Sequence, residues 1–165
     1  VNPTIDTGAI SGMVVSGEIN LKGMRIGGHE NSTTDFNYDG DSILIDYDLI
    51  VFPGDYIVFG VEEDITLNGG VDIDVLYSRG TGFNSLTLAN GSDEVIIINE
   101  SDMVIDEVMY DNGSTFPVPS GASMQLEPFN DHLDNDDGLN WCEAFTSYGD
   151  GDFGTPGTDN ESCNP

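Results

Sequence analysis

Short apolar runs separated by turn residues are the feature that most constrains the fold of this chain. No stretch repeats apolar residues every three or four positions, whereas runs rich in Val, Ile, Phe and Tyr recur between clusters of Gly, Asn, Asp and Pro. This pattern predicts an all-β protein. The predicted strands are Ile10 to Val15, Ile19 to Ile26, Ser42 to Ile45, Tyr56 to Phe59, Val71 to Tyr77, Leu86 to Leu88, Glu94 to Ile98, Val104 to Tyr110 and Ser123 to Leu126.

One pair of these strands predicts a hairpin, because Glu94 to Ile98 and Val104 to Tyr110 flank the short polar stretch Asn99 to Asp102. Ile96 and Ile98 are expected to share its core face. Turn residues such as Phe52-Pro-Gly-Asp55 and Asn68-Gly-Gly70 separate other runs. Many short strands joined by such turns indicate a sandwich or a barrel. At 165 residues, we expect one domain spanning residues 1–165.

The charge of the chain excludes several classes of partner. Three Lys and Arg stand against 31 Asp and Glu, for a formal net charge of −28. Nucleic acids and anionic membranes are bound chiefly through Lys and Arg, so we expect neither as a partner. No apolar run approaches the ~20 residues of a membrane span, so we expect no membrane insertion. Like charges repel in the compact state, and salt or divalent cations relieve that repulsion.

The two cysteines, Cys142 and Cys163, lie near the C-terminal end. We expect a disulfide between them, and loop-closure entropy gives it roughly 3 kcal/mol. Two unpaired buried thiols are the alternative. A disulfide indicates an oxidising compartment, so we expect a secreted or cell-surface protein. The residues after Val1 show no signal peptide, which suggests a mature or trimmed exported segment.

Several motifs together resemble the bacterial lamin-tail domain. They are Leu67-Asn-Gly-Gly-Val-Asp72, Leu86 to Val95, Met103 to Tyr110, Phe116 to Leu126, Asn135 to Cys142 and Tyr148 to Gly157. The resemblance covers most of the chain from Ile19 onward. It implies an immunoglobulin-like β-sandwich that serves as an accessory module, in bacteria often inside large exported proteins. The chromatin binding of animal lamin tails is not carried over, because the charge opposes it.

The strongest local motif is Asp35-Phe-Asn-Tyr-Asp-Gly40, which places oxygen ligands at alternate positions before a glycine. This spacing is typical of the first half of a calcium loop. The candidate metal ligands are Asp35, Asn37, Asp39, Asp41 and Asp46. An acidic turn solvated by water is the alternative. Two further acidic clusters, at Asp134 to Gly138 and Asp150 to Asp152, have suitable atoms, but the resemblance explains them as turn residues of the family.

We expect no catalytic residues and no organic cofactor. His29 and His132 have no accompanying nucleophile motif, and Gly80-Thr-Gly82 lacks the third glycine of a dinucleotide fingerprint. Trp141 is either a core residue beside the disulfide or a sugar-stacking platform. Five asparagines begin an Asn-x-Ser/Thr triplet, which is either accidental or used for glycosylation: Asn31, Asn90, Asn99, Asn112 and Asn160.

These observations favour a non-catalytic structural or adhesive module, calcium-stabilised and self-assembling or bound to a protein or cell-surface partner. The alternative is a calcium-dependent carbohydrate- or surface-binding module of a larger secreted enzyme, which uses Trp141 or Tyr148 as its aromatic platform. An enzyme is the third alternative, and no residue can be named for its chemistry.

Overall fold

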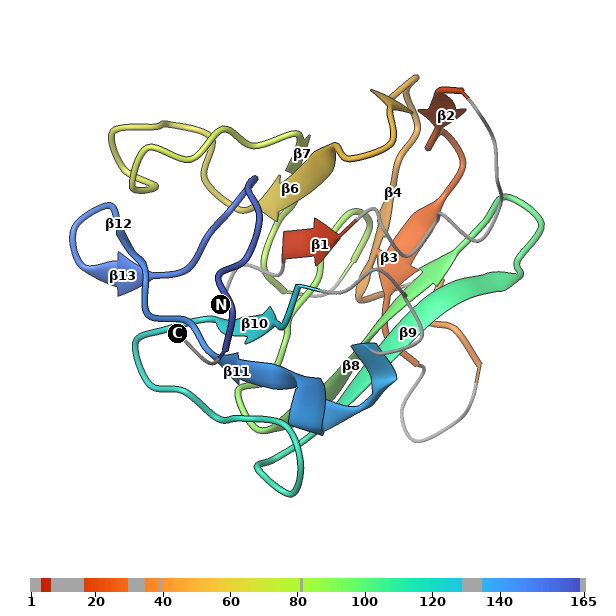
Figure 1. Ribbon diagram of the computed structural model, residues 1–165. Helices are drawn as coiled ribbons and strands as arrows, with labels where there is room; N and C mark the ends of the chain where they lie inside the picture. The colour runs from red at the N-terminus through yellow and green to blue at the C-terminus, as the bar shows by residue number, and fades with distance from the viewer. Residues whose placement is uncertain are drawn as a thin grey trace.

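The computed structural model describes residues 4–6, 17–29, 35–38, 40–80, 82–128 and 135–163, and for residues 4–6 the backbone alone. In these residues the chain is built of short strands with one short 3-10 helix, so the all-β prediction is confirmed (Figure 1). The elements are β1 Thr4–Asp6, β2 Ile19–Asn20, β3 Arg25–Gly27, β4 Ser42–Leu44, β5 Ile50–Val51, β6 Tyr56–Gly60, β7 Val75–Leu76, β8 Ser92–Ile98, β9 Val104–Asp111, β10 Met124–Leu126, η3 Gly138–Asn140, β11 Trp141–Glu143, β12 Ser147–Tyr148 and β13 Asp152–Phe153.

The largest sheet has the strand order β4-β3-β8-β9 and is antiparallel throughout. Ile26 in β3 lies opposite Ile43 in β4 and opposite Ile97 in β8. These three side chains form a row across the sheet, and all three belong to the main core. Because directly opposed residues point to the same face of a sheet, this row marks the face that is buried in the core.

The other side of that core comes from a second group of strands. Strand β6 pairs antiparallel with β1 and parallel with β7, while β2 pairs with β5. Ile57 and Phe59 of β6 and Val51 of β5 are buried in the same cluster as the Ile26 row. Both groups of strands therefore contribute side chains to one core.

The hairpin prediction is confirmed, with β8 and β9 paired over most of their length. Asn99 closes its turn, because its backbone N donates to the carbonyl of Met103. The pairing slips between Ile97 and Ile98, so that Val104 lies opposite Ile98. This bulge places Val104 on the face that also carries Glu107 and Met109. Without the bulge, strict alternation along the strand would place Val104 on the opposite face.

Strand β8 is buried on both faces. Ile96 and Ile98 are each 1% exposed and Ile97 is 5% exposed. Ile97 belongs to the main core, and Ile96 and Ile98 lie outside that cluster although both are buried. A strand covered on both sides reads as a continuous apolar run, which explains the sequence Val95 to Ile98.

The C-terminal region is held by β10 and β11 and by a disulfide. Gln125 in β10 lies opposite Cys142 in β11. Cys142 is bonded to Cys163, with Cα atoms 5.7 Å apart, as predicted. The Cys163 backbone N donates to the Glu127 carboxylate just after β10. The segment that follows Trp141 is therefore tied back to the sheet from which it leaves.

Three predicted strands differ from the observed elements. The run from Ile19 to Ile26 is divided into β2 and β3 by a turn at Gly23, whose φ of 87° is unfavourable for other residues. Within the predicted strand from Val71 to Tyr77, only Val75 and Leu76 form a strand, β7. The residues from Leu86 to Leu88 form no strand, although Leu86 is buried. The strand predicted from Ile10 to Val15 lies outside the described residues.

Candidate functional site

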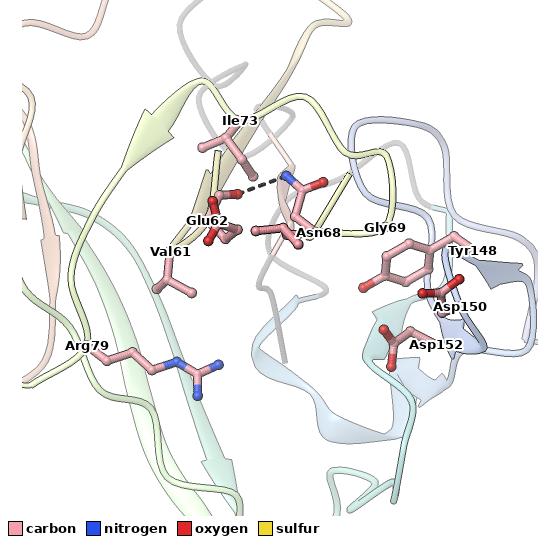
Figure 2. A pocket seen from close by; sticks show the side chains of 11 residues that line it. Val61, Glu62, Asn68, Gly69, Ile73, Arg79, Tyr148, Asp150 and Asp152 are labelled. Carbon is pink, nitrogen blue, oxygen red and sulfur yellow. Dashed lines mark hydrogen bonds between the residues drawn. The ribbon is translucent and has the colours of Figure 1, made fainter. Parts of the chain in front are cut away.

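A surface pocket of about 230 Å³ lies between the loop that joins β6 to β7 and the β12–β13 hairpin. Figure 2 shows Arg79 reaching into the space from one wall, while Tyr148 and Asp152 form the facing wall. Its lining residues are Gly60, Val61, Glu62, Leu67, Asn68, Gly69, Ile73, Arg79, Tyr148, Asp150 and Asp152.

Asn68 fixes the loop on the β6–β7 side of this pocket. Its Nδ2 donates to the carbonyls of Glu62 at 2.8 Å and Val71 at 2.7 Å. Its Oδ1 accepts from the backbone N of Gly70 and of Val71. The amide thus uses both its donor and its acceptor on neighbouring backbone, which holds the loop in one shape without help from a sheet.

Backbone contact between two glycines joins the walls of the pocket. A Cβ on Gly149, in the turn after β12, would lie 2.8 Å from the Cα of Gly69 in the facing loop. Gly69 and Gly149 also have φ values of 83° and 54°. Any side chain at Gly149 would force the loops apart, so the width of the pocket depends on this contact.

The charges in the pocket are separated rather than paired. Arg79 forms no ion pair with a described residue, while Glu62, Asp150 and Asp152 also line the space. Burial raises the pKa of the Tyr148 hydroxyl, and the Asp152 carboxylate raises it further. Tyr148 therefore remains a neutral hydrogen-bonding ring at physiological pH. A half-buried ring flanked by carboxylates and one guanidinium suits a small ligand rich in hydroxyl groups.

The predicted calcium ligands are spread over the two ends of β4. Asp35, Asn37 and Asp41 lie in the loop that precedes this strand, and Asp39 lies outside the described residues. Asp46 lies at the other end of the strand, two residues after Leu44. Among the residues that the structure describes, no three His, Cys, Asp or Glu side chains are grouped to hold a metal ion.

Two of the loop ligands already have structural roles. Asn37 Oδ1 accepts from the Gly40 backbone N at 3.0 Å. Asp41 has a φ of 30°, and its Oδ1 accepts from the Thr87 backbone N at 2.7 Å. Burial raises the pKa of the Asp41 carboxyl, and the carboxylates of Asp93 and Glu94 add to this. The loop therefore carries oxygen ligands of the type that calcium prefers. Asp41 also ties this loop to the segment before β8 through its hydrogen bond with Thr87.

His29 and Trp141 have structural roles. The His29 backbone N donates to Glu94 Oε1 at 2.6 Å, which joins β3 to β8 beyond the end of their ladder. His132 lies outside the described residues. The Trp141 indole N–H donates to the Asn135 carbonyl at 2.9 Å, and its ring packs against Phe116 with centroids 5.9 Å apart. This supports Trp141 as a packing residue rather than a sugar platform.

Sequence reasoning named Tyr148, Asp150 and Asp152 but missed the opposite wall of the pocket. Glu62, Asn68 and Arg79 are distant in sequence from the β12–β13 hairpin, and no spacing rule connects them to it. Arg79 carried one usable signal, since it is one of three strong cations in the chain.

The chain matches no protein-family model, and neither a curated protein nor a solved structure matches it. In the part of the chain that the structure describes, no helix is long and apolar enough to cross a membrane.

Proposed function

We propose that the chain is a non-catalytic interaction module of the cell exterior, built as an immunoglobulin-like β-sandwich of the lamin-tail type. Two groups of strands share one apolar core, which supports a sandwich. The disulfide supports an oxidising, extracellular environment. The partner is a protein or a cell-surface component, and a second copy of the chain is the first candidate.

The observation that carries this proposal is the outer strand of the largest sheet. Strand β9 pairs with β8 on one side and is the last strand of the sheet among the described residues. Val104 and Met109 on this strand are 57% and 56% exposed. A long edge strand with exposed apolar side chains is a template for pairing with another strand.

The charges on β9 make such pairing dependent on cations. Glu107 is exposed and shares a face with Val104 and Met109. When two copies pair antiparallel about the middle of β9, their Glu107 carboxylates come close together, and like charges that face each other across strands are destabilising. Calcium or high salt removes this repulsion, so self-association through β9 depends on the cation concentration.

Sedimentation velocity of the full chain tests this proposal at about 0.1 M NaCl, where repulsion between nearby carboxylates is not fully screened, with either calcium or EDTA added. We expect a calcium-dependent dimer, and Glu107→Gln should allow dimers in EDTA. Met109→Lys should abolish association, whereas Leu139→Lys is the matched control, because Leu139 is 79% exposed and the change in charge is the same. A chain that stays monomeric in every buffer, or equal loss of association in the control, contradicts self-assembly.

Calcium stabilisation is the second part of the proposal, with Asp35, Asn37, Asp39, Asp41 and Asp46 as the ligands. A calcium titration followed by the melting temperature tests it. We expect Asp35→Asn to weaken the calcium response, while Asp72→Asn, at another exposed carboxylate, leaves it unchanged. The same calcium response in both variants would show that calcium acts through general charge screening.

A second candidate function is the binding of carbohydrate, favoured by the position of Tyr148 between Arg79 and Asp152 in the pocket. Polar acceptors around an aromatic ring suit a sugar ring. A panel of neutral and acidic monosaccharides should raise the melting temperature beyond the effect of calcium. Tyr148→Ala should remove that increase, and Phe145→Ala, at an aromatic residue that is 43% exposed outside the pocket, should keep it.

A further inference from the structure

Asn-x-Ser/Thr triplets are more frequent in this chain than chance predicts. The sequence has 14 Asn and 24 Ser and Thr among 165 residues, so about two of the asparagines would be followed at the second position by Ser or Thr. Five are. Four of these triplets lie in described residues, and their surroundings separate them into two kinds.

Two triplets lie side by side at one end of the β8–β9 hairpin. Asn90 comes just before β8 and Asn112 just after β9, where Ser92 lies opposite Asp111. The Asn112 backbone N donates to the Gly91 carbonyl at 3.2 Å, which holds the two turns together. Both asparagines are exposed. No described residue forms a hydrogen bond with either side-chain amide.

The other two triplets use their asparagine amides to hold the fold. Asn160 is half-buried, its Nδ2 donates to the Leu126 carbonyl at 2.9 Å, and its Oδ1 accepts from Thr155 Oγ1 at 2.7 Å. Asn99 Oδ1 accepts from the backbone N of Ser101 at 2.9 Å and of Met103 at 3.1 Å. A sugar on Asn160 Nδ2 would occupy the space of that bond, and Asn99 is half-buried in the hairpin turn that its Oδ1 holds.

We propose that Asn90 and Asn112 are N-glycosylation sites. The donor is a glycan linked to a polyisoprenyl diphosphate, and a transferase supplies the catalytic groups. The side-chain Nδ2 attacks C1 of the glycan, the N–C1 bond forms and the bond from C1 to the diphosphate oxygen breaks. One amide proton passes to a base of the transferase, and the lipid diphosphate leaves. The chain is the acceptor and supplies the exposed amide and the Ser hydroxyl.

The position of these sites fits the rest of the molecule. The turn at Asn112 and Gly113, with φ values of 57° and 84°, projects beyond the end of the sheet and leaves the β8–β9 ladder intact. A glycan there adds bulk and hydration without charge, on a surface that already carries an excess of carboxylates. The disulfide belongs to the same exported, oxidising environment in which such transferases act.

Two experiments test the proposal with the full chain. In the first, the chain is secreted from yeast, digested with an endoproteinase that cuts at Glu, and mapped by mass spectrometry after N-glycosidase F treatment in heavy-oxygen water. In the second, folded unglycosylated chain is incubated with a purified transferase and a lipid-linked glycan. In both, we expect Asn90 and Asn112 to have several-fold higher occupancy than Asn99 and Asn160.

Two variants provide the controls. Ser92→Ala and Ser114→Ala should each remove one glycan with little change in the melting temperature, because both serines are exposed and Ser114→Ala removes one solvent-exposed hydrogen bond, from the Ser114 Oγ to the Asp111 carbonyl. The proposal is overturned by three results: Asn90 and Asn112 remain unmodified in both experiments, Asn160 reaches equal occupancy, or these two sites are modified in unfolded chain but not in folded chain.

Discussion

The stability of this fold should depend steeply on ionic strength, because almost none of its negative charge is neutralised internally. Among the described residues, Lys22 and Asp48 form the one ion pair between a strong cation and a carboxylate, at 3.3 Å. Arg25 lies over the ring of Tyr38, 5.6 Å from its centroid. Nearly all of the net charge of −28 therefore acts on the folded state as mutual repulsion.

The size of the chain sets the magnitude of this repulsion. A compact chain of this length is close to a sphere of about 20 Å radius, in which a charge of −28 has a self-energy of roughly 80 kcal/mol in water without salt. Screening reduces this to roughly 50 kcal/mol at 0.01 M salt and roughly 10 kcal/mol at 1 M. The expanded unfolded chain changes by only about 8 kcal/mol over that range.

The difference between these values, about 30 kcal/mol, is an upper bound, because carboxylates take up protons and bind counterions. A tenth of it, about 3 kcal/mol, is still a large part of the 5–15 kcal/mol that stabilises a typical domain. We therefore expect the melting temperature to rise by many degrees between 0.01 M and 1 M KCl.

The assay is thermal unfolding followed by circular dichroism at pH 7.5 in EDTA, with KCl varied from 0.01 M to 1 M. A charge-reduced variant separates screening from general salt effects on hydrophobic burial. It replaces five exposed carboxylates that accept no hydrogen bond from a described residue: Glu63→Gln, Asp72→Asn, Glu100→Gln, Asp136→Asn and Glu143→Gln.

Repulsion scales with the square of the charge, so reducing −28 to −23 lowers it by about a third. The variant should melt at a higher temperature in 0.01 M KCl and show a shallower dependence on salt. The reasoning is refuted if the wild-type melting temperature is independent of KCl, or if the variant and the wild type have the same salt dependence.

Three further perturbations have defined outcomes. Replacing both Cys142 and Cys163 by Ser should cost about 3 kcal/mol in denaturant unfolding, because the bond spans 21 positions and closes that loop in the unfolded chain; an unchanged midpoint would show that the tail is held without it. Ile97→Ala should cost about 2–5 kcal/mol in the same assay through loss of core packing, whereas Met109→Ala, on the exposed edge, should cost less than about 0.5 kcal/mol. Burial raises the pKa of the Tyr110 hydroxyl, which also donates to the Ala89 carbonyl at 2.6 Å. The folded state then binds the hydroxyl proton more tightly than the unfolded state, so stability is lost as the pH rises above about 10. Tyr110→Phe should remove that part of the pH dependence. An identical alkaline stability profile in the variant and the wild type would contradict this role of Tyr110.

The strands that the sequence predicted best are those whose partners are close in the chain. The β8–β9 hairpin follows from two apolar runs and a four-residue polar turn, and its local turn chemistry at Asn99 decides the register near that end. Its bulge was not predictable, because the slip between Ile97 and Ile98 depends on packing against both faces of β8.

Other strands depend on contacts that no local pattern records. Leu86 has the apolar character of a strand, yet it is buried in a segment that β4 and Ser78 approach through isolated bridges rather than through a full ladder. Conversely, β11 includes Cys142 and Glu143, which carry weak local strand signals, and it forms because β10 lies opposite. Tertiary pairing decides such short strands more than intrinsic propensity does.

The same limit applies to the candidate site. Spacing along the chain predicts Asp46 as the twelfth position of the acidic loop, and β4 separates it along the chain from the other predicted ligands. The pocket wall around Arg79 and Asn68 faces the β12–β13 hairpin through the Gly69–Gly149 contact. Such a meeting of distant loops is a property of the folded chain alone.

The bond between Cys142 and Cys163 also determines how the domain bears mechanical load. A pull applied beyond Cys163 passes through the two sulfur atoms directly into Cys142 and from there into the β10–β11 pair. The residues between the cysteines carry none of that tension, and they include β12, β13 and the Tyr148 wall of the pocket. Under a pulling force from the C-terminal side, the pocket wall formed by Tyr148 and Asp152 would thus bear no tension, while the remaining strands resist the force.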